Sequence, residues 1–356
     1  MIILSMYFLY ISIPILKEKV NTDTNITVAW RYTSNWEKNE LNQLCFRGKK
    51  IEYGNNDFVI ILLGDSQVES TCTDFEHIAE NCLQKSINHK NIKVFSLGAG
   101  GYGTDQQFLA LKEYYSKGYK ADLVLLWFTP ENDVINNIFP VHDLKWKTQK
   151  PTFTIKDNIL STPQYFDIDT FYSNLPAPGY SFIPYDKTKK YTNILKTEES
   201  TKEMQVSGLE TGHTYLSMFL SPKPKIIDYG IDLTKKLLSE VNNLCRENHS
   251  DFYVFYNKLK SEEIQFSYGQ FNYSGEYLAS EEKGSVILFD KVLWDNTKEI
   301  LSEVNNFDIV LDDVNNNILM GNEDRHLNNL GNNRAMQLLS KILFKKSLLK
   351  KEENHG

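Results

Sequence analysis

Four apolar runs constrain the fold of this chain more than any other feature. They lie at residues 58–63, 94–97, 123–128 and 252–256, and helical patterns separate them. A run that is apolar at every position predicts a strand buried on both faces, and strands that alternate with helices predict a parallel sheet. We therefore expect an α/β fold, a three-layer α/β/α sandwich in which right-handed crossovers join the strands.

The helical patterns complete this expectation. Apolar residues at helix-face spacing predict one helix from Val68 to Ile87, a second over 106–116, a third over 233–247 and a last one after Gly331. Each of these helices precedes or follows one of the predicted strands along the chain. We therefore assign the strands and helices to one domain, residues 20–356.

Two stretches interrupt the alternation. Prolines and aromatic residues gather between 139 and 225 without the pattern of a second core, which predicts a long loop-rich insertion at one edge of the sheet. Its aromatic residues either stack on sugar rings or pin the insertion to the core, and the second alternative is favoured; they are Trp146, Phe153, Tyr165, Phe166 and Tyr172. Residues 258–293 are expected to be a shorter irregular stretch.

The first nineteen residues differ from the rest of the chain. Residues 2–16 are almost wholly apolar, and Lys17 and Lys19 follow. As a helix they span about 22 Å, less than the roughly 30 Å of a bilayer core, and no cleavage-site pattern follows. An uncleaved membrane anchor over 1–19, complete or truncated, is favoured over a buried core helix. The positive-inside rule would leave the domain in the cytoplasm, whereas an envelope substrate would place it outside, so the orientation stays open.

Composition excludes several partners. The net charge of −7 argues against nucleic-acid binding, because no basic surface is available to neutralise phosphates. The four cysteines show no Cys-x-x-Cys spacing and no accompanying histidine pattern, which leaves a metal site unsupported. Cys72 and Cys82 lie on one predicted helix, too far apart for a disulfide. A buried free thiol is expected for each cysteine.

Polar residues follow three of the predicted strands. Gly64-Asp65-Ser66 follows the first apolar run, a glycine-rich turn that contains Gly101 follows the second, and Asn132 follows the third. Ligands bind at the carboxyl ends of the strands in open α/β sheets. Taken singly, each feature is more often a turn or a helix cap.

A histidine completes the set. His326 lies two residues after Asp324, shortly before the last predicted helix, and a nearby carboxylate can orient an imidazole so that one nitrogen accepts a proton. A serine, backbone and amide donors, and an Asp/His pair are together the groups that acyl transfer through a serine nucleophile requires.

The glycine-rich turn allows a second interpretation. Gly98-x-Gly100-x-x-Gly103 between a strand and a helix fits a dinucleotide fingerprint. That fingerprint expects an acidic residue at the end of the next strand, but Asp122 precedes its strand. A dinucleotide-dependent oxidoreductase is therefore disfavoured.

These motifs resemble those of the SGNH/GDSL-type esterases. Gly64-Asp65-Ser66 matches the first block of that family, Gly101 the second, Asn132 the third and the Asp324/His326 pair the last, in the Asp-x-His form. The chain departs from the family at Gln67, where a leucine is usual, and at Pro130, where glycine is usual. Glu323, three residues before the histidine, is the alternative acid.

The resemblance implies a flavodoxin-like SGNH hydrolase fold and an esterase or O-acyltransferase. It implies Ser66 as nucleophile, His326 as base and Asp324 as its acid, with Ser66, Gly101 and Asn132 forming the oxyanion hole. It implies no cofactor and no metal. The expected substrate is an acylated small molecule or an envelope polysaccharide, and a membrane-bound O-acyltransferase is an expected partner. The alternative is a non-catalytic carbohydrate-binding or scaffold protein that keeps the fold.

Overall fold

The computed structural model describes most of the predicted domain. It describes residues 38–140, 150–166, 215–219, 223, 225–259, 263–267, 279–281, 285–311 and 326–349. The predicted N-terminal anchor (1–19), most of the predicted insertion, and both candidate acids, Glu323 and Asp324, lie outside these residues. Within the described part of the chain, no helix is long and apolar enough to cross a membrane.

Five parallel strands form the central sheet. They are β1 (Phe58–Gly64), β2 (Ile92–Gly98), β3 (Leu123–Trp127), β6 (Asp251–Leu259) and β10 (Asn306–Leu311). The four apolar runs form β1, β2, β3 and β6, as predicted. The order across the sheet is β2-β1-β3-β6-β10, which is the flavodoxin-like order.

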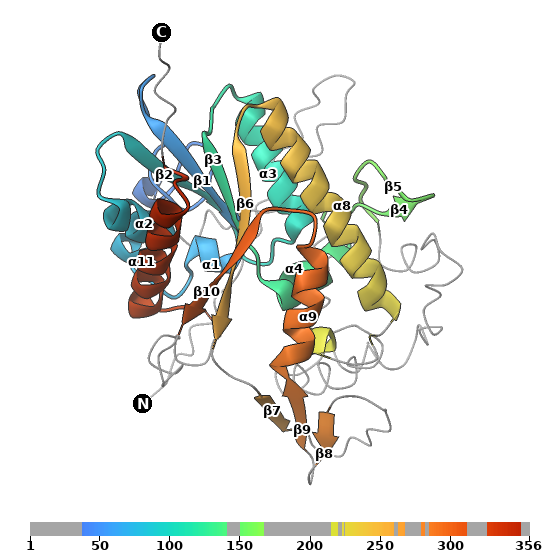
Figure 1. Ribbon diagram of the computed structural model, residues 1–356. Coiled ribbons are helices and arrows are strands. Elements are labelled where there is room, and N and C mark those ends of the chain that lie inside the picture. The colour runs from blue at the N-terminus through green and yellow to red at the C-terminus, as the bar shows by residue number, and fades with distance from the viewer. Residues whose placement is uncertain are drawn as a thin grey trace, which may run out of the picture.

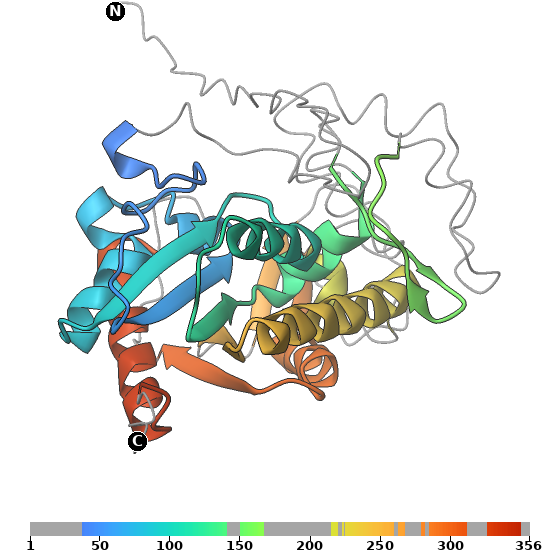
Figure 2. The same ribbon diagram turned by 90° about the horizontal axis from the view of Figure 1, so that it is seen from above.

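Alternating residues of β1 build the two cores of the molecule. Val59, Ile61 and Leu63 pack into one hydrophobic cluster, and the three residues that alternate with them pack into a second cluster on the opposite face. The first face carries α3 (Thr104–Ser116), α4 (Pro130–Ile138), α8 (Lys225–Glu247) and α9 (Asp290–Ile300). The second carries α2 (Ala79–Ile87) and α11 (Asn329–Lys345). Figures 1 and 2 show the sheet between these layers, which confirms the predicted three-layer fold.

Side chains protect the outer edge of β2. Among the described residues, strand β2 has a neighbouring strand only on its β1 side, so its other backbone groups need partners from elsewhere. On α2, the Glu80 carboxylate accepts the N–H of Ser96, and Gln84, one turn later, bonds the backbone of Val94 and Ile92. The sheet edge is thereby closed by the helix that covers it.

The prediction of one helix from Val68 to Ile87 was wrong. The segment forms a one-turn α1 (Ser66–Glu69), a 3-10 turn η3 (Phe75–His77) and α2. Ser70 ends α1 in the left-handed conformation, with φ of 58°. Ser70 and the residues that follow it include Thr71, Thr73 and Asp74, and such side chains compete for backbone hydrogen bonds and disfavour a continuous helix.

The break in this helix also changes the interpretation of the cysteines. Cys72 is not on a helix with Cys82, and all four thiols are free. Cys82 and Cys245 are buried as expected, but Cys45 is exposed and Cys72 is half-buried. The prediction of burial was therefore wrong for Cys45 and only partly met for Cys72.

The stretch 258–293 was wrongly expected to be irregular. It contains β7 (Glu263–Ser267), β8 (Ala279–Glu281) and β9 (Ser285–Phe289), which form a small antiparallel sheet before α9 (Figure 1). The polar-apolar alternation of β7 and the apolar run in β9 are the sequence signals that indicate these strands.

Part of the predicted insertion packs on the core. Its described residues include a short hairpin of β4 (Ile155–Lys156) and β5 (Ile159–Leu160), and a 3-10 turn η4 (Tyr215–Phe219). Phe153 is buried, with its ring 5.9 Å from that of Phe108 on α3. For Phe153, packing against the core rather than sugar stacking is therefore the role that the structure shows.

Candidate active site

Three of the predicted site residues lie at one edge of the sheet. Gly64 at the end of β1 pairs in register with Gly98 at the end of β2, and β3 ends beside them. The segments that leave these strands carry Ser66, Gly101 and Asn132. Because β2 and β3 lie on opposite sides of β1, this edge is also the topological switch point at which open α/β sheets bind ligands.

Ser66 is the first residue of α1, and close packing fixes its position. The Asp65 side chain caps the helix by accepting the N–H of Gln67 at 2.9 Å. A Cβ atom added at Gly64 would lie 2.4 Å from Val68, and one at Gly98 would lie 2.5 Å from the same side chain. The two glycines therefore allow α1 to pack directly over the ends of β1 and β2.

His326 lies against Ser66. Its Nε2 is 2.5 Å from Ser66 Oγ, although the two residues are 260 positions apart in the sequence. Asn328 caps α11 by accepting the N–H groups of Leu330 and Gly331 at 3.0 Å. The distance between Nε2 and Oγ is within the reach that a general base needs to take the serine proton.

The histidine segment is also joined to the loop that follows α1. Asn329 Nδ2 donates to Asp74 at 2.8 Å, and Asn329 Oδ1 accepts the Asp74 N–H at 3.1 Å. Asn332 Nδ2 donates to Ser70 Oγ at 3.0 Å. The loop that holds the nucleophile therefore also positions the helix that follows the base.

Asn132 lies in the first turn of α4, and its amide is held on both sides. Its Nδ2 donates to Asp65 Oδ2 at 2.6 Å, and its Oδ1 accepts from Asn136 at 2.9 Å. A side-chain amide carries two N–H groups, so one N–H can bond Asp65 while the other serves the predicted oxyanion role. Sequence reasoning assigned Asp65 no function, and its contact with Asn132 shows that it orients this amide.

Gly101 lies in the turn between β2 and α3, with a φ of 73°. This left-handed conformation favours glycine over other residues. The preceding residue, Gly100, donates its N–H to Glu69 Oε2 at 2.6 Å. The turn is thus hydrogen-bonded to the last residue of α1, the helix that begins with Ser66.

Two buried carboxyl groups lie behind the nucleophile. Burial raises the pKa of Asp65, against the N–H of Gln67 and the charge of His326, which favour its ionised form. Burial raises the pKa of Asp133 well above its usual range, and the charge of Asp65 adds to this shift. Asp133 accepts from the backbone N–H of Thr129 at 2.6 Å. An ionised Asp65 attracts His326, and this attraction would stabilise the protonated imidazole that proton transfer from Ser66 creates.

The geometry argues against a dinucleotide site. The Asp122 carboxylate accepts the N–H of Val59 at the start of β1, at the opposite end of the strands from the glycine-rich turn. Packing accounts for the glycines themselves, since a Cβ at Gly103 would lie 2.5 Å from Asn137 Oδ1 and one at Gly98 would meet Val68. In the described part of the chain, no group of three or more His, Cys, Asp or Glu side chains is placed to bind a metal.

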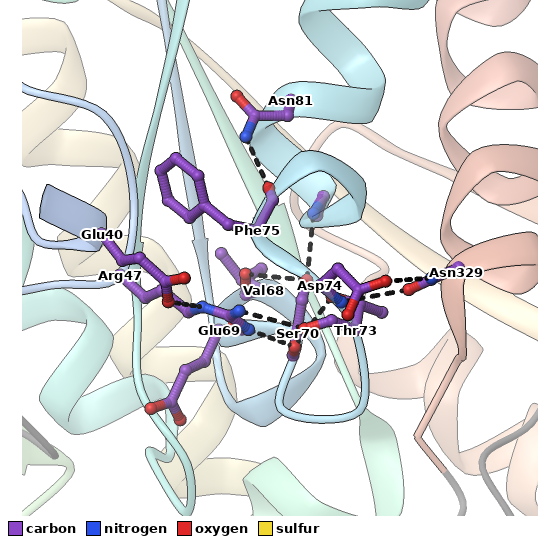
Figure 3. Close-up of polar contacts among 11 residues, drawn as sticks. Glu40, Arg47, Val68, Glu69, Ser70, Thr73, Asp74, Phe75, Asn81 and Asn329 are labelled. Carbon is purple, nitrogen blue, oxygen red and sulfur yellow. Dashed lines mark hydrogen bonds and ion pairs between the residues drawn. The ribbon is translucent and has the colours of Figure 1, made fainter. Parts of the chain in front are cut away.

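Arg47 is a further buried residue near the site that sequence reasoning missed. Its guanidinium donates to the backbone carbonyls of Ser70 at 2.7 Å and Thr73 at 3.0 Å, and pairs with Glu40 at 3.3 Å (Figure 3). Burial lowers the pKa of Arg47, and the negative charge of Glu40 opposes this shift. In the sequence, Arg47 lies in a polar segment without period, and no local signal marks it.

A buried ion pair supports the other side of the turn. Lys150, fully buried, pairs with Asp105 in the first turn of α3. The Asp105 N–H donates to Asn137 of α4 at 3.1 Å, and Asn137 donates to Thr234 of α8 at 2.8 Å. These contacts join three helices of one layer behind the turn that carries Gly101.

Comparison with known proteins gave distant structural matches alone. No protein-family model matches the sequence, and no curated protein matches it significantly. One similar solved structure is an acetyl xylan esterase, Est2A, from the rumen bacterium Butyrivibrio proteoclasticus, with 9% identity and a TM-score of 0.35. Another is a family two carbohydrate esterase from Clostridium thermocellum in complex with cellohexaose, with 9% identity and a TM-score of 0.36.

These matches are partial. They cover 85% and 83% of this chain, which in turn spans 66% of the length of each of those proteins. At this level of similarity they assign neither a family nor an activity. The function is therefore argued from the geometry of the site.

Proposed function

We propose that this protein is a serine esterase of the SGNH type that cleaves or transfers acyl groups through a Ser66 acyl-enzyme. The observation that carries the proposal is the 2.5 Å distance between Ser66 Oγ and His326 Nε2 at the carboxyl edge of the sheet. A structural serine has no need of an imidazole at this distance, whereas a nucleophile requires one. The non-catalytic scaffold alternative leaves this pairing unexplained.

The proposed reaction uses the groups assigned to the site. Ser66 Oγ attacks the ester carbonyl carbon while its proton passes to His326 Nε2, and the carbonyl electrons move onto the oxygen. The N–H groups of Ser66, Gly101 and Asn132 Nδ2 stabilise this oxyanion. Collapse of the intermediate expels the alcohol, which takes the proton from His326, and leaves the acyl-enzyme. The family motif assigns the orientation of the imidazole to Asp324, and an ionised Asp65 would stabilise the protonated form of the imidazole.

The proposed substrate is an acyl ester, with an acetylated envelope polysaccharide as the preferred class. The acyl-enzyme then passes its acyl group either to water or to a sugar hydroxyl. Incubation with an acetyl donor and an acceptor oligosaccharide, followed by mass spectrometry, distinguishes the two by the ratio of free acetate to acetylated sugar.

We also propose that the protein is anchored in a membrane and that it has a membrane-bound O-acyltransferase as a partner. They stem from the N-terminal segment 1–19, which is apolar over residues 2–16, and from the envelope substrate class. Fractionation of cells that express the full chain tests the anchor, and loss of membrane association on deletion of residues 1–19 is the expected result. Co-purification with an O-acyltransferase from detergent-solubilised membranes tests the partner.

The decisive experiment is covalent labelling of purified protein with a fluorophosphonate, together with hydrolysis of an activated acetyl ester. We expect labelling at Ser66 and a loss of about 10⁴-fold or more in kcat for Ser66→Ala and for His326→Ala. Asn132→Ala is expected to lose about 10²- to 10³-fold and keep measurable activity. The matched control is Ser116→Ala, an exposed serine on α3. Wild-type activity in Ser66→Ala would refute the proposal, and an unlabelled wild-type protein would favour the scaffold alternative.

A further inference from the structure

The Glu69 carboxylate connects two parts of the proposed site. Glu69 is the last residue of α1, its side chain is 3% exposed, and its Oε2 accepts the Gly100 N–H at 2.6 Å. Gly100 directly precedes Gly101, the proposed oxyanion donor. The bond fixes the orientation of the Ala99–Gly100 peptide group, and only the two backbone torsions of Gly100 separate this group from the Gly101 N–H.

The turn that carries Gly101 needs such a restraint. Residues 98, 100, 101 and 103 are all glycine, and glycine is the residue with the greatest backbone freedom. A hydrogen bond to a carboxylate is about twice as strong as one between neutral groups, and 2.6 Å is a short distance for it. Glu69 thus restrains the turn over residues 98–103, whose glycines would otherwise allow many backbone conformations.

The position of Glu69 is itself fixed by Arg47. The guanidinium donates to the carbonyl oxygens of Ser70 at 2.7 Å and of Glu69 at 3.4 Å (Figure 3). These two residues form the C-terminal end of α1. Its positive charge also interacts with the Glu69 carboxylate. The same short helix therefore begins with the nucleophile and ends with the restraint on the oxyanion donor.

We propose that Glu69 is a positioning residue for the reaction: through Gly100 it holds the Gly101 amide at a fixed place relative to the Ser66 hydroxyl. The inference rests on the proposed esterase function and adds a residue that the family motif does not supply. Glu69 touches no reacting atom in this scheme. Its contribution is confined to the tetrahedral intermediate, in which the oxyanion is present.

The test compares two substitutions of similar size. Glu69→Leu removes the acceptor, whereas Glu69→Gln keeps an oxygen that can accept the Gly100 N–H. We expect Glu69→Leu to lower kcat on an activated acetyl ester about 100-fold, with KM unchanged within about threefold. Glu69→Gln keeps an acceptor but loses the charge, so it is expected to lose less than Glu69→Leu, about three- to tenfold. The control is Glu76→Ala, an exposed carboxylate on η3 that should change neither constant.

A second measurement separates positioning from general loss of structure. Methylboronic acid forms a tetrahedral adduct with a reactive serine and places an oxygen at the oxyanion position, so its affinity should fall with kcat in Glu69→Leu. The pH dependence of kcat/KM should keep its shape, because Ser66 and His326 are untouched. If Glu69→Leu does not fold, Glu69→Asp, which is one methylene too short to reach Gly100, should lose about tenfold in kcat and in methylboronic acid affinity.

The outcomes distinguish this inference from the proposed function. Full activity in Glu69→Leu or in Glu69→Asp, alongside an inactive Ser66→Ala, would overturn the role of Glu69 and leave the esterase intact. Wild-type activity in Ser66→Ala would overturn both. Equal losses in Glu69→Leu and Glu69→Gln would show that charge, rather than the bond to Gly100, matters, and would also refute the inference.

Discussion

The two residues that meet at 2.5 Å, Ser66 and His326, are held in different ways. Ser66 begins α1, which packs on the ends of β1 and β2 through Val68. The Arg47 guanidinium donates to the Ser70 carbonyl at the end of this helix, and these contacts are buried. The segment after His326 is held by the Asp74–Asn329 pair, which is exposed, and by an inner contact between Asn332 and Ser70.

Because of this difference, the contacts near Ser66 should contribute to the stability of the fold, whereas the exposed contact near His326 should mainly align the imidazole. Contacts on the nucleophile side bury polar groups, so their loss leaves unsatisfied donors and acceptors and costs several kcal/mol. An exposed contact on the histidine side is replaced by water at little cost. We therefore expect substitutions on the nucleophile side to change the free energy of unfolding, and substitutions at Asn329 to change catalysis alone.

The largest expected effect is that of Arg47→Met. The substitution removes the donor to the Ser70 and Thr73 carbonyls and leaves Glu40 unpaired. We expect the free energy of unfolding to fall by about 3–5 kcal/mol, measured by urea denaturation. Lys291→Met, which breaks an exposed pair with Asp295, is the control and should leave the midpoint unchanged. Similar midpoints for the two variants would contradict the comparison.

The pH dependence of Glu80 is the next largest effect. Burial raises the pKa of Glu80 to about 7 from 4.5, although it accepts the N–H groups of Lys49 and Ser96. The unfolded chain releases this proton near pH 4.5, while the folded protein keeps it until about pH 7. The stability that this proton contributes is therefore fully present below pH 4.5 and is lost as the pH rises through 7.

Glu80→Gln tests this dependence because glutamine can accept one of the same N–H groups and does not titrate. From about pH 5 to about pH 8, the wild type should lose on the order of 3 kcal/mol of unfolding free energy relative to the variant. Denaturant titrations at both pH values measure the difference. Parallel changes in the two proteins would show that Glu80 does not titrate in this range.

Burial also explains which parts of the structure could be predicted from the sequence. Strands β1 and β3 are buried on both faces, so their residues are apolar at every position and the runs are visible. Strand β10 lies at the edge of the sheet and alternates exposed and buried residues. Because polar residues interrupt its apolar ones, it shows no continuous apolar run and was not predicted. The break after Ser70 was missed because helix-face spacing continues across it.

In the candidate site, too, some residues could be predicted from the sequence and others could not. Ser66, Asn132 and His326 are marked by short motifs next to strands and helices, and such local signals survive in a single sequence. The contact of Glu69 with Gly100 joins residues 31 positions apart, and that of Arg47 with Ser70 joins residues 23 apart. In sequence, a lone glutamate or arginine is indistinguishable from a solvated surface residue, so these roles required the structure.

A smaller effect is expected from Gly98→Ala, which tests the packing of α1. The new Cβ would lie 2.5 Å from Val68 Cβ, so α1 must shift away from β2. We expect a loss of about 1–3 kcal/mol in unfolding free energy together with a fall in kcat, because Ser66 moves with α1. The control is Gly54→Ala, at which the new Cβ makes only ordinary contact, at 3.6 Å. Full activity in Gly98→Ala would show that α1 does not need this position.

The smallest effect on stability, and the sharpest test of the comparison, is that of Asn329→Ala. It removes both bonds to Asp74 at the surface, so the melting temperature should change by less than about 1 °C. The segment that carries His326 then keeps inner contacts such as the one between Asn332 and Ser70, and we expect kcat to fall about three- to tenfold as the imidazole is held less firmly. Asp74→Ala removes only the side-chain acceptor and keeps the backbone N–H that donates to Asn329, so it should give a smaller loss, and the double substitution should lose no more than Asn329→Ala. Additive losses would show that Asn329 and Asp74 act on the site separately, which would contradict the role of their contact in aligning His326.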